Sequence, residues 1–450
     1  MGFVYEEISN RSKHGKPTFY TDVHSSSVIE LKDIRSKVVG SMPENSYFRG
    51  IKTFIFEAFF PEGYPDSVSN DYLTYQAWDT LQAFASSISG SLATKAVLEG
   101  VGVGDGNATA LAATITWLLR QGAGMISQIL FTWMQGSDLD HNCKKWRLFA
   151  DILNDSAMCL ELSGPLWPSF LIQFVLCFAS VARSLVGVAG GATRTAITQH
   201  QAKAGNISDV AAKDGSQETL VNLLALLVNL TMLPLVAENM TLTWFLFFGL
   251  TVLHLFANFK AVSSLCFQTL NRDRLILAIQ SYNSNNKKVI DNPEEINKKE
   301  NVLIGFGLSE NDLFKHLPEY SKINVKIDIG VPLTTIVSLP HENPDNEHPV
   351  IEQMKKDLSD FNFSIIPDVR DQKCHRYNVL LSSKFKKEKL LHVYFIAYKM
   401  TSSTISLTTS ESVKKYEQEY TLFEEKLIEA GWKTEQLQLN TMGFTGNFLQ

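Results

Sequence analysis

Two long stretches without a charged residue most constrain what this chain can fold into. The first runs from Leu220 to Ala237 and the second from Thr241 to Phe259, and neither contains Asp, Glu, Lys or Arg. Each is close to the length that an α-helix needs to cross the hydrocarbon core of a bilayer. A helix that is apolar on every side is either deeply buried in protein or embedded in lipid. The pair therefore predicts a membrane-inserted helical hairpin.

The region before the hairpin extends this prediction. Only 21 of the 188 residues from Tyr72 to Phe259 are charged, against 20% of the whole chain. This region contains six helix-length stretches, at roughly 72–98, 107–134, 145–163, 168–199, 217–237 and 241–262. Glycines and single charges interrupt the first four, so only the last two are clear transmembrane signals.

The positions of basic residues favour six spans. Lysine and arginine near the ends of spans collect on the cytoplasmic side. Here they occur in alternate connections, and the segments 99–106, 164–167 and 238–240 contain none. We therefore predict a multi-pass membrane protein with both termini in the cytoplasm, in an organelle or the plasma membrane. A chain with two or four spans, its other helices lying on the membrane surface, is the alternative.

A weak internal similarity accompanies the six stretches. Phe84–Ala96 and Phe178–Thr195 share the pattern Phe-Ala-Ser followed by Ala-Thr and a basic residue. A duplicated unit of three helices would be inverted between the two halves, as in many secondary transporters. Chance similarity between two alanine-rich helices is the alternative.

The chain changes character after Arg274. The segment Ser281–Glu300 is polar, Ile323–Ile329 alternates like a half-buried strand, and His392–Tyr398 resembles a buried strand. Ser412–Ala430 has helical spacing, with Gly431 placed to cap it.

We therefore predict a mainly α fold, a polytopic membrane module followed by a small soluble α+β domain. The expected boundaries are 1–60 for a polar N-terminal region, 61–265 for the membrane module, 266–300 for a linker and 301–450 for the soluble domain.

Several function classes find no support in the composition. A net charge of −6 gives no reason to expect a nucleic-acid partner. The five cysteines are scattered without a CxxC, so neither a zinc site nor a disulfide framework is expected. No cofactor, metal or catalytic triad is predicted. His254 stands alone in an apolar stretch and is expected to be a packed histidine rather than a metal ligand or proton relay.

The middle of the chain resembles the root UVB-sensitive (RUS) family of eukaryotic membrane proteins. The residues that carry the resemblance are Gly63–Val68, Trp78–Asp79, Leu92–Val97, Gly100–Asp105, Trp146–Asp155, Val186–Arg194 and Lys213–Asn222. The resemblance implies a membrane protein without an agreed biochemical activity, whose plant members are linked to UV-B responses and vitamin B6 homeostasis. It supplies no catalytic residues.

The first candidate site is a glycine-rich segment that contains Gly100, Gly102, Gly104 and Asp105. Its spacing does not fit a dinucleotide fingerprint or a P-loop. We expect a flexible turn between two helices, with a substrate-binding loop as the alternative.

The second candidate is a polar helix face. Arg147, Asp151 and Asp155 are four residues apart and so lie on one side of a helix. A solvated or ion-paired face is the simpler explanation. If the helix lies inside a membrane bundle, Asp151 and Asp155 become candidates for cation or proton coupling.

Isolated charges form the third candidate set, which comprises Asp79, Lys95, Arg120, Arg183 and Arg194. We expect ion pairs that hold helices together, or a basic lining for an anionic solute. The polar run Lys213–Glu218 is expected to cap the helix that follows, with Ser216 as the N-cap, or to act in gating or partner docking.

These features favour a membrane protein that binds or transports a small polar or anionic solute and is not an enzyme. The alternative is a membrane-anchored scaffold that recruits a protein partner through residues 301–450. A soluble enzyme with a very apolar core is a third hypothesis.

Overall fold

The structure is a computed structural model of the chain. It describes residues 4–7, 18–23, 30–33, 54–100, 110–136, 138–236, 238–286, 289–302, 325–337, 347–368, 375–401 and 408–446. The chain divides into two compact units. The first comprises Met1–Ala108, Met158–Pro168 and Arg194–Ala261, and the second comprises Thr109–Ala157, Ser169–Thr193 and Val262–Gln450.

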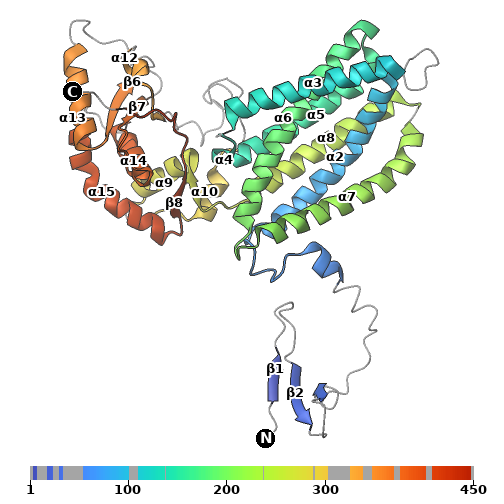
Figure 1. Cartoon of the computed structure of the whole chain (residues 1–450), viewed down its shortest axis with the longest axis horizontal. Helices are drawn as coiled ribbons and strands as arrows, with labels where there is room; N and C mark the ends of the chain where they lie inside the picture. Colours follow the sequence, from blue (N-terminus) through green and yellow to red (C-terminus); the bar gives the residue numbers. More distant parts are fainter. Residues whose placement is uncertain are drawn as a thin grey trace. The chain divides into compact units, whose positions relative to one another are not determined.

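Each of the six expected stretches is a helix (Figure 1). They are α2 (Tyr72–Gly100), α3 (Ala110–Gln135), α5 (Cys143–Leu162), α6 (Ser169–Gln201), α7 (Ile207–Val236) and α8 (Met240–Ser264). The expectation that glycines and charges interrupt the early helices is wrong, because α2 continues through Gly90 and α6 through Gly187. The expected N-cap is also wrong. Helix α7 begins at Ile207, so Ser216 lies inside it.

Three of the described helices are long and apolar enough to cross a membrane, judged by length and composition. They are Leu171–Gln201 of α6, the whole of α7 and the whole of α8. The structure thus adds α6 to the two spans that are clear from the sequence. The six-span arrangement and its inverted repeat stay predictions.

Helix α7 has the polarity of a membrane helix rather than of a soluble one. Its buried residues include Asp214, Ala225 and Asn229, whereas Leu226, Leu230 and Leu235 are among its exposed ones. In a soluble protein the leucines would be buried and the carboxylate exposed. This pattern favours association with a membrane over the hypothesis of a soluble protein with a very apolar core.

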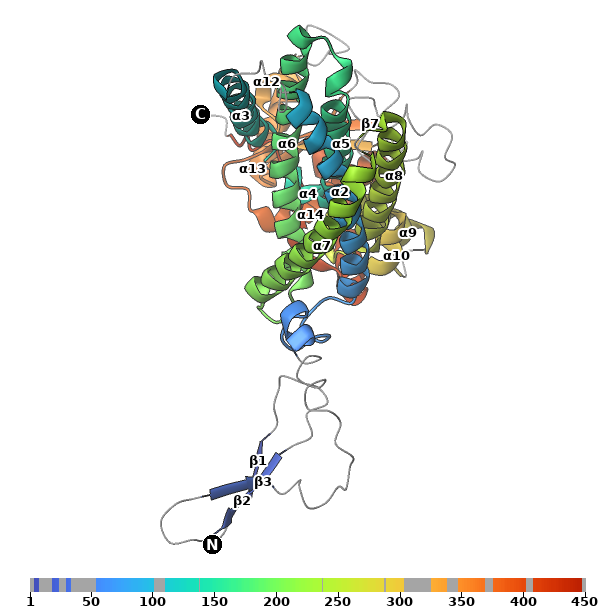
Figure 2. The ribbon, with the colours of Figure 1, turned by 90° about the vertical axis from the view of Figure 1, so that its right-hand side faces the viewer.

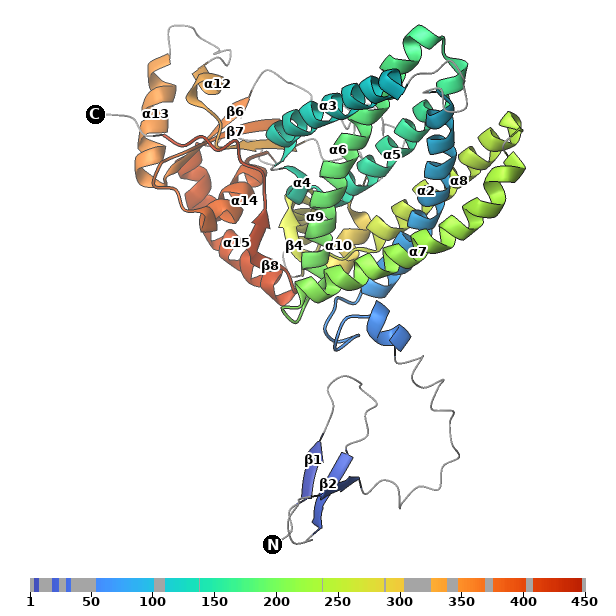
Figure 3. The ribbon, with the colours of Figure 1, turned by 45° about the vertical axis from the view of Figure 1, so that its right-hand side comes forward.

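In the first unit α2 packs against α7 and α8. The side-chain amide of Asn229 on α7 donates to Ser91 Oγ on α2 at 2.7 Å. Leu92 and Ala93 of α2 share an apolar cluster with Phe247 of α8. Figure 3 shows α2 and α7 side by side. The same unit includes a small antiparallel sheet in the order β1 (Val4–Glu7), β2 (Thr18–Val23) and β3 (Glu30–Asp33) (Figure 2).

In the second unit α3 crosses the first part of α6 closely. Ser180 Oγ donates to the carbonyl oxygen of Arg120 at 2.9 Å. Gly124 lies against Ser180 and Ser184, where a Cβ atom would collide with Ser184. Small residues at a crossing let two helix backbones approach, as is common between membrane helices.

The C-terminal part of the second unit is an α+β structure. Its sheet has the order β5 (Val325–Ile329), β7 (His375–Leu381) and β6 (Phe363–Asp368), with β5 parallel and β6 antiparallel to β7. A second, two-stranded sheet pairs β4 (Thr269–Asn271) with β8 (Lys433–Gln438) in parallel. The remaining helices are α4 (Asp138–His141), α9 (Arg272–Ser284), α10 (Pro293–Lys299), α12 (Leu333–Val337), α13 (Glu347–Asp360), α14 (Leu390–Thr401) and α15 (Thr409–Glu429).

Two local predictions in this part are confirmed and one is wrong. The alternating segment forms β5, and α15 is followed by Gly431 at a φ of +92°. The segment His392–Tyr398 is part of α14 and not a strand. It is apolar on all sides because α14 is buried almost completely, so its periodicity could not distinguish helix from strand.

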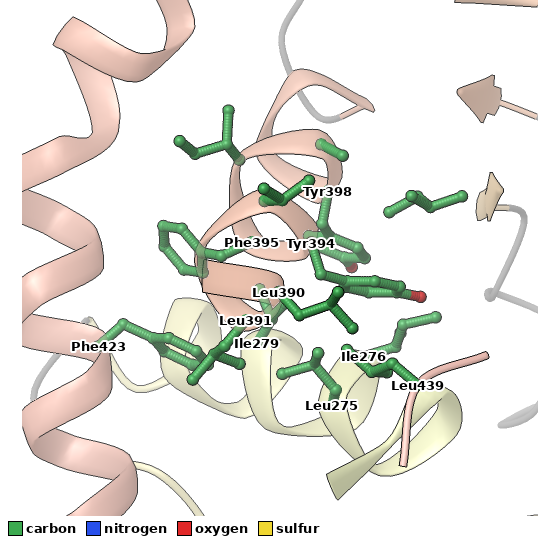
Figure 4. Close-up of a cluster of buried hydrophobic side chains, with 14 of the residues drawn as sticks. Leu275, Ile276, Ile279, Leu390, Leu391, Tyr394, Phe395, Tyr398, Phe423 and Leu439 are labelled. Carbon is green, nitrogen blue, oxygen red and sulfur yellow. The ribbon is translucent and has the colours of Figure 1, made fainter. Parts of the chain in front are cut away.

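The segment 266–300 is not a linker. Leu275, Ile276 and Ile279 of α9 are fully buried in the C-terminal core, against Tyr394 and Phe395 of α14 (Figure 4). The polar residues that suggested a linker are instead helix caps and ion pairs. Asn292 and Glu295, for example, form a capping box at the start of α10.

A buried charge cluster ties the start of α5 to this core. The Glu300 carboxylate pairs with Lys144 Nζ at 3.0 Å and with Arg274 Nη1 at 2.9 Å, and their side chains are at most 3% exposed. Asn271 donates to the same carboxylate at 2.8 Å, and Lys144 donates to Asn297 at 2.7 Å. Every member therefore has a hydrogen-bond partner, which buried charges require.

We expect Glu300→Ala to lower the stability of the protein by about 3–5 kcal/mol, because it leaves two buried cations without a counter-charge. The matched control is Glu294→Ala, since Glu294 pairs with Lys298 while both side chains are 69% exposed. That change should leave the melting temperature almost unchanged, because ion pairs between exposed side chains contribute little to stability. Thermal unfolding in detergent measures both. Equal losses for the two variants would contradict the structural role of Glu300.

Acid should weaken the same cluster. Burial on its own would raise the pKa of the Glu300 carboxyl, but the charges of Arg274 and Lys144 lower it from 4.5 to about 2. A carboxyl with a lowered pKa stabilises the folded state above its unfolded pKa, and this contribution is lost as the pH falls through the folded pKa. The difference in melting temperature between the native protein and Glu300→Gln should be constant above about pH 5 and shrink toward pH 2. A difference that stays constant throughout would show that Glu300 is not ionised.

Candidate functional site

Three charged residues meet at the junction of α6 and α7 in the first unit. Arg194, near the end of α6, donates through Nε to Asp214 Oδ2 at 2.6 Å, and its Nη2 lies 2.6 Å from the same oxygen. Its Nη1 lies 2.7 Å from Glu218 Oε2, one turn further along α7. The Asp214 side chain is 11% exposed, whereas Arg194 and Glu218 are 42% and 47% exposed. The Asp214 end of this group of charges is thus buried, and the end formed by Arg194 and Glu218 is accessible to solvent.

Helix α2 completes the buried end. Gln76 donates to Asp214 Oδ1 at 3.2 Å, so both oxygens of this carboxylate accept hydrogen bonds. One turn away, Asp79 accepts from the Tyr75 hydroxyl at 3.3 Å and from Gln82 at 3.2 Å. The sequence-predicted Asp79 thus lies on α2 within one turn of Gln76, which contacts the carboxylate that Arg194 holds.

Further polar contacts surround this region. His200 Nε2 lies 2.8 Å from Asp71 Oδ2, which joins the end of α6 to the residue before α2. Gln217 donates to the carbonyl of Phe59 at 2.6 Å, and Lys213 donates to the carbonyl of Glu57. The polar run Lys213–Glu218 thus binds other segments through its side chains. We call the residues Gln76, Asp79, Arg194, Asp214 and Glu218 the α6–α7 network.

Acidic residues outnumber basic ones here. The α6–α7 network holds three carboxylates and one guanidinium, and Asp71, Asp209 and Lys213 lie next to it. Among the described residues, no group of three or more His, Cys, Asp or Glu is arranged to hold a metal ion. The arrangement suits hydrogen bonding and charge pairing.

The predicted polar face of α5 lies in the second unit. Asp155 is buried at 5% exposure, and Arg147 and Asp151 are half-buried, whereas Ile152 is exposed. The carboxylates thus lie on the inner side of the helix rather than on a solvated face. Arg183 of α6 donates to the uncharged side chain of Asn154 of α5 at 3.4 Å, so this contact between the helices is a hydrogen bond to a neutral residue.

Of the remaining candidates, the structure describes Lys95, Arg120 and Gly100. Arg120 is half-buried on α3, and its carbonyl oxygen accepts from Ser180. Gly100 is the last residue of α2. Gly102, Gly104 and Asp105 lie outside the described residues. His254 is 1% exposed, as expected for a packed histidine.

Sequence reasoning missed the partners of Arg194. Asp214 and Glu218 stand out in the sequence only as part of a polar run, although they are four residues apart on one face of a helix. Gln76 and His200 do not stand out as site residues in the sequence, because single polar residues near the ends of helices are common. A search for carboxylates at this spacing in a span-length helix would have found the pair.

Comparison with known proteins agrees with the resemblance in the sequence. Residues 46–286 match the model of the vitamin B6 photo-protection and homoeostasis domain. The chain is 44% identical over 301 residues to RUS family member 1 of Dictyostelium discoideum. The aligned region covers 65% of this chain and 56% of that relative. It is 32% identical over 400 residues to protein root UVB sensitive 3 of Arabidopsis thaliana, covering 88% of this chain and 86% of the relative.

The match spans both the helical region and the α6–α7 network. No solved structure is similar to the chain. The family model covers more than half of the residues, and the Arabidopsis protein aligns over most of both chains. The chain belongs to the root UVB-sensitive (RUS) family.

Proposed function

We propose that the protein is a membrane protein that binds and moves a small polar solute, with the α6–α7 network as a gate at one end of its helices. The observation that carries the proposal is the convergence of this network. Residues far apart in the sequence come together where two span-length helices meet. Ionisable residues within membrane helices are costly and are usually retained for function.

The exposure gradient supports a gating role. Asp214 is held on both oxygens, so breaking its contacts would leave a buried charge. The contact between Arg194 and Glu218 involves two half-exposed side chains, and such pairs contribute only about 0–1 kcal/mol. A solute could therefore replace Glu218 on Arg194 at low cost while Asp214 holds Arg194 in place.

Vitamin B6 compounds are the first solutes to test, because the matching family model carries that name. The charges of the network do not strongly favour a solute of one sign. Arg194 could bind a phosphate or carboxylate, whereas the carboxylates around it favour a cation or a neutral compound. The test panel should therefore contain pyridoxine, its phosphate derivatives, simple organic anions and organic cations.

Purified protein in proteoliposomes should take up at least one member of this panel. Arg194→Gln should lower the uptake rate about tenfold, the equivalent of one charge-assisted hydrogen bond. Lys298→Gln, which removes an exposed ion pair on α10, is the control and should leave uptake unchanged. Absence of uptake and of binding across the panel would refute the proposal.

The second candidate is a scaffold that recruits a protein through the C-terminal α+β part. The observation in its favour is that this part has a hydrophobic core of its own. The two functions predict different results for Arg194→Gln in cells that depend on the protein. A scaffold would tolerate the change as long as the protein accumulates normally, whereas a solute carrier would lose function.

A further inference from the structure

The segment that precedes α2 is bound to the first turns of α7. Three side chains of α7 contact its backbone, and they are Asp209, Lys213 and Gln217. Asp209 Oδ2 accepts from the N–H of Glu62 at 2.7 Å, and Gln217 donates to the carbonyl oxygen of Phe59 at 2.6 Å. Lys213 donates to the carbonyl oxygen of Glu57. The three side chains are four residues apart and share one face of α7, so they fix the segment along that face.

The same turns of α7 mark the boundary between water and lipid. Glu218 is the last charged residue of the helix, and none follows it up to Val236. At 1.5 Å per residue this uncharged part is about 27 Å long, close to the thickness of the hydrocarbon core. Gln217 therefore lies at the membrane surface, and Asp209 lies about 12 Å further into the water.

Aromatic rings gather at the level of Gln217. The rings of Phe56 and Phe60 stack with their centroids 5.0 Å apart. The ring of Tyr64 lies 4.9 Å from that of Phe60 and 6.0 Å from that of Tyr72. Gln217 also donates to the Tyr72 hydroxyl at 3.3 Å, which ties this series of rings to the same turn of α7. Tyrosine is enriched where a membrane meets water, because its ring is apolar and its hydroxyl is polar.

The first turn of the segment is apolar and uncovered. Phe54, Ile55 and Phe56 belong to a helical turn at 54–59, and they are between 42% and 70% exposed. Neighbouring apolar side chains that are exposed together mark an interaction surface. These three residues directly precede Glu57, which is bound to α7, so they lie near the boundary between water and lipid.

We propose that Phe54, Ile55 and Phe56 insert into the interfacial layer of the membrane that holds α7, between the lipid headgroups and the upper acyl chains. Lipid is the occupant favoured over a protein partner, because the exposed Leu220 and Leu223 of α7 meet lipid at the same level. A helix in this layer buries its apolar side chains about 5–10 Å deep. The inference goes beyond the proposed function, since it assigns a surface that attaches the start of α7 to the membrane.

Fluorescence quenching by spin-labelled lipids tests this placement. The fluorescent amino acid dansylalanine replaces Phe54, Glu62 or Leu230, one at a time, in the full chain in lipid vesicles. The vesicles contain phosphatidylcholine with a doxyl quencher either next to the headgroup or deep in the acyl chain. At position 54 the shallow quencher should remove about half of the fluorescence and more than the deep quencher removes, as expected for the depth of an interfacial helix.

The other two positions calibrate the depth. Glu62 is exposed on the same segment, and Asp209 holds it two helical turns before Gln217. Its replacement should lose less than about a tenth of its fluorescence to either quencher, because it lies about 12 Å outside the boundary. Leu230 is exposed near the middle of the uncharged part of α7, so the deep quencher should act more strongly there.

Two results would overturn the proposal. Quenching at position 54 as weak as at position 62 would mean that the patch faces water and is free for a protein partner. Stronger quenching by the deep lipid would mean that the segment enters the hydrocarbon core. Ile55, which is also exposed, takes the place of Phe54 if that variant does not accumulate. Quenching does not involve uptake, so a protein that fails the uptake assay and shows the expected quenching keeps this membrane contact and contradicts only the proposed transport.

Discussion

The cost of burying a polar group where no water can reach it governs the arrangement of these helices. Their outer surfaces are leucine-rich, and their polar side chains are turned inward, as on α7. Each inward polar group must then find a partner on a neighbouring helix. The bond from Asn229 to Ser91 and the contacts of Asp214 with Arg194 and Gln76 are such pairings. The packing of the helices and the pairing of their polar side chains therefore depend on each other in this protein.

Much of the fold follows from hydrophobic patterns along the chain. All six helix-length stretches are helices, and in the three span-length ones the helix satisfies the backbone hydrogen bonds within the segment, as lipid requires. The apolar pattern did not predict where α7 begins. The helix starts at Ile207, and its first turns are polar and carry the side chains that bind Arg194 and Gln76. The composition of a segment signals burial, and it does not signal where a helix begins.

The errors in the C-terminal part have a related cause. Residues 266–300 contain enough Asn, Lys and Glu to look like a linker, yet several of these residues cap helices or neutralise buried charges. Glu300 is the clearest example, since its partner Lys144 comes from a distant part of the chain, at the start of α5. Similarly, the partners of Arg194 could not be assigned until the helices were placed. Long-range pairing of polar residues depends on the packing that it stabilises.

Exposure distinguishes the roles of the two charge networks. The cluster around Glu300 is excluded from water. Losing any one member leaves the others as buried charges without a partner, so the cluster can act only as a permanent attachment. The α6–α7 network combines a buried anchor, Asp214, with an accessible pair, Arg194 and Glu218. The accessible pair can exchange partners at little cost. Under the proposed function, a conformational change linked to the solute would therefore occur at the junction of α6 and α7, and the attachment at Glu300 would persist through it.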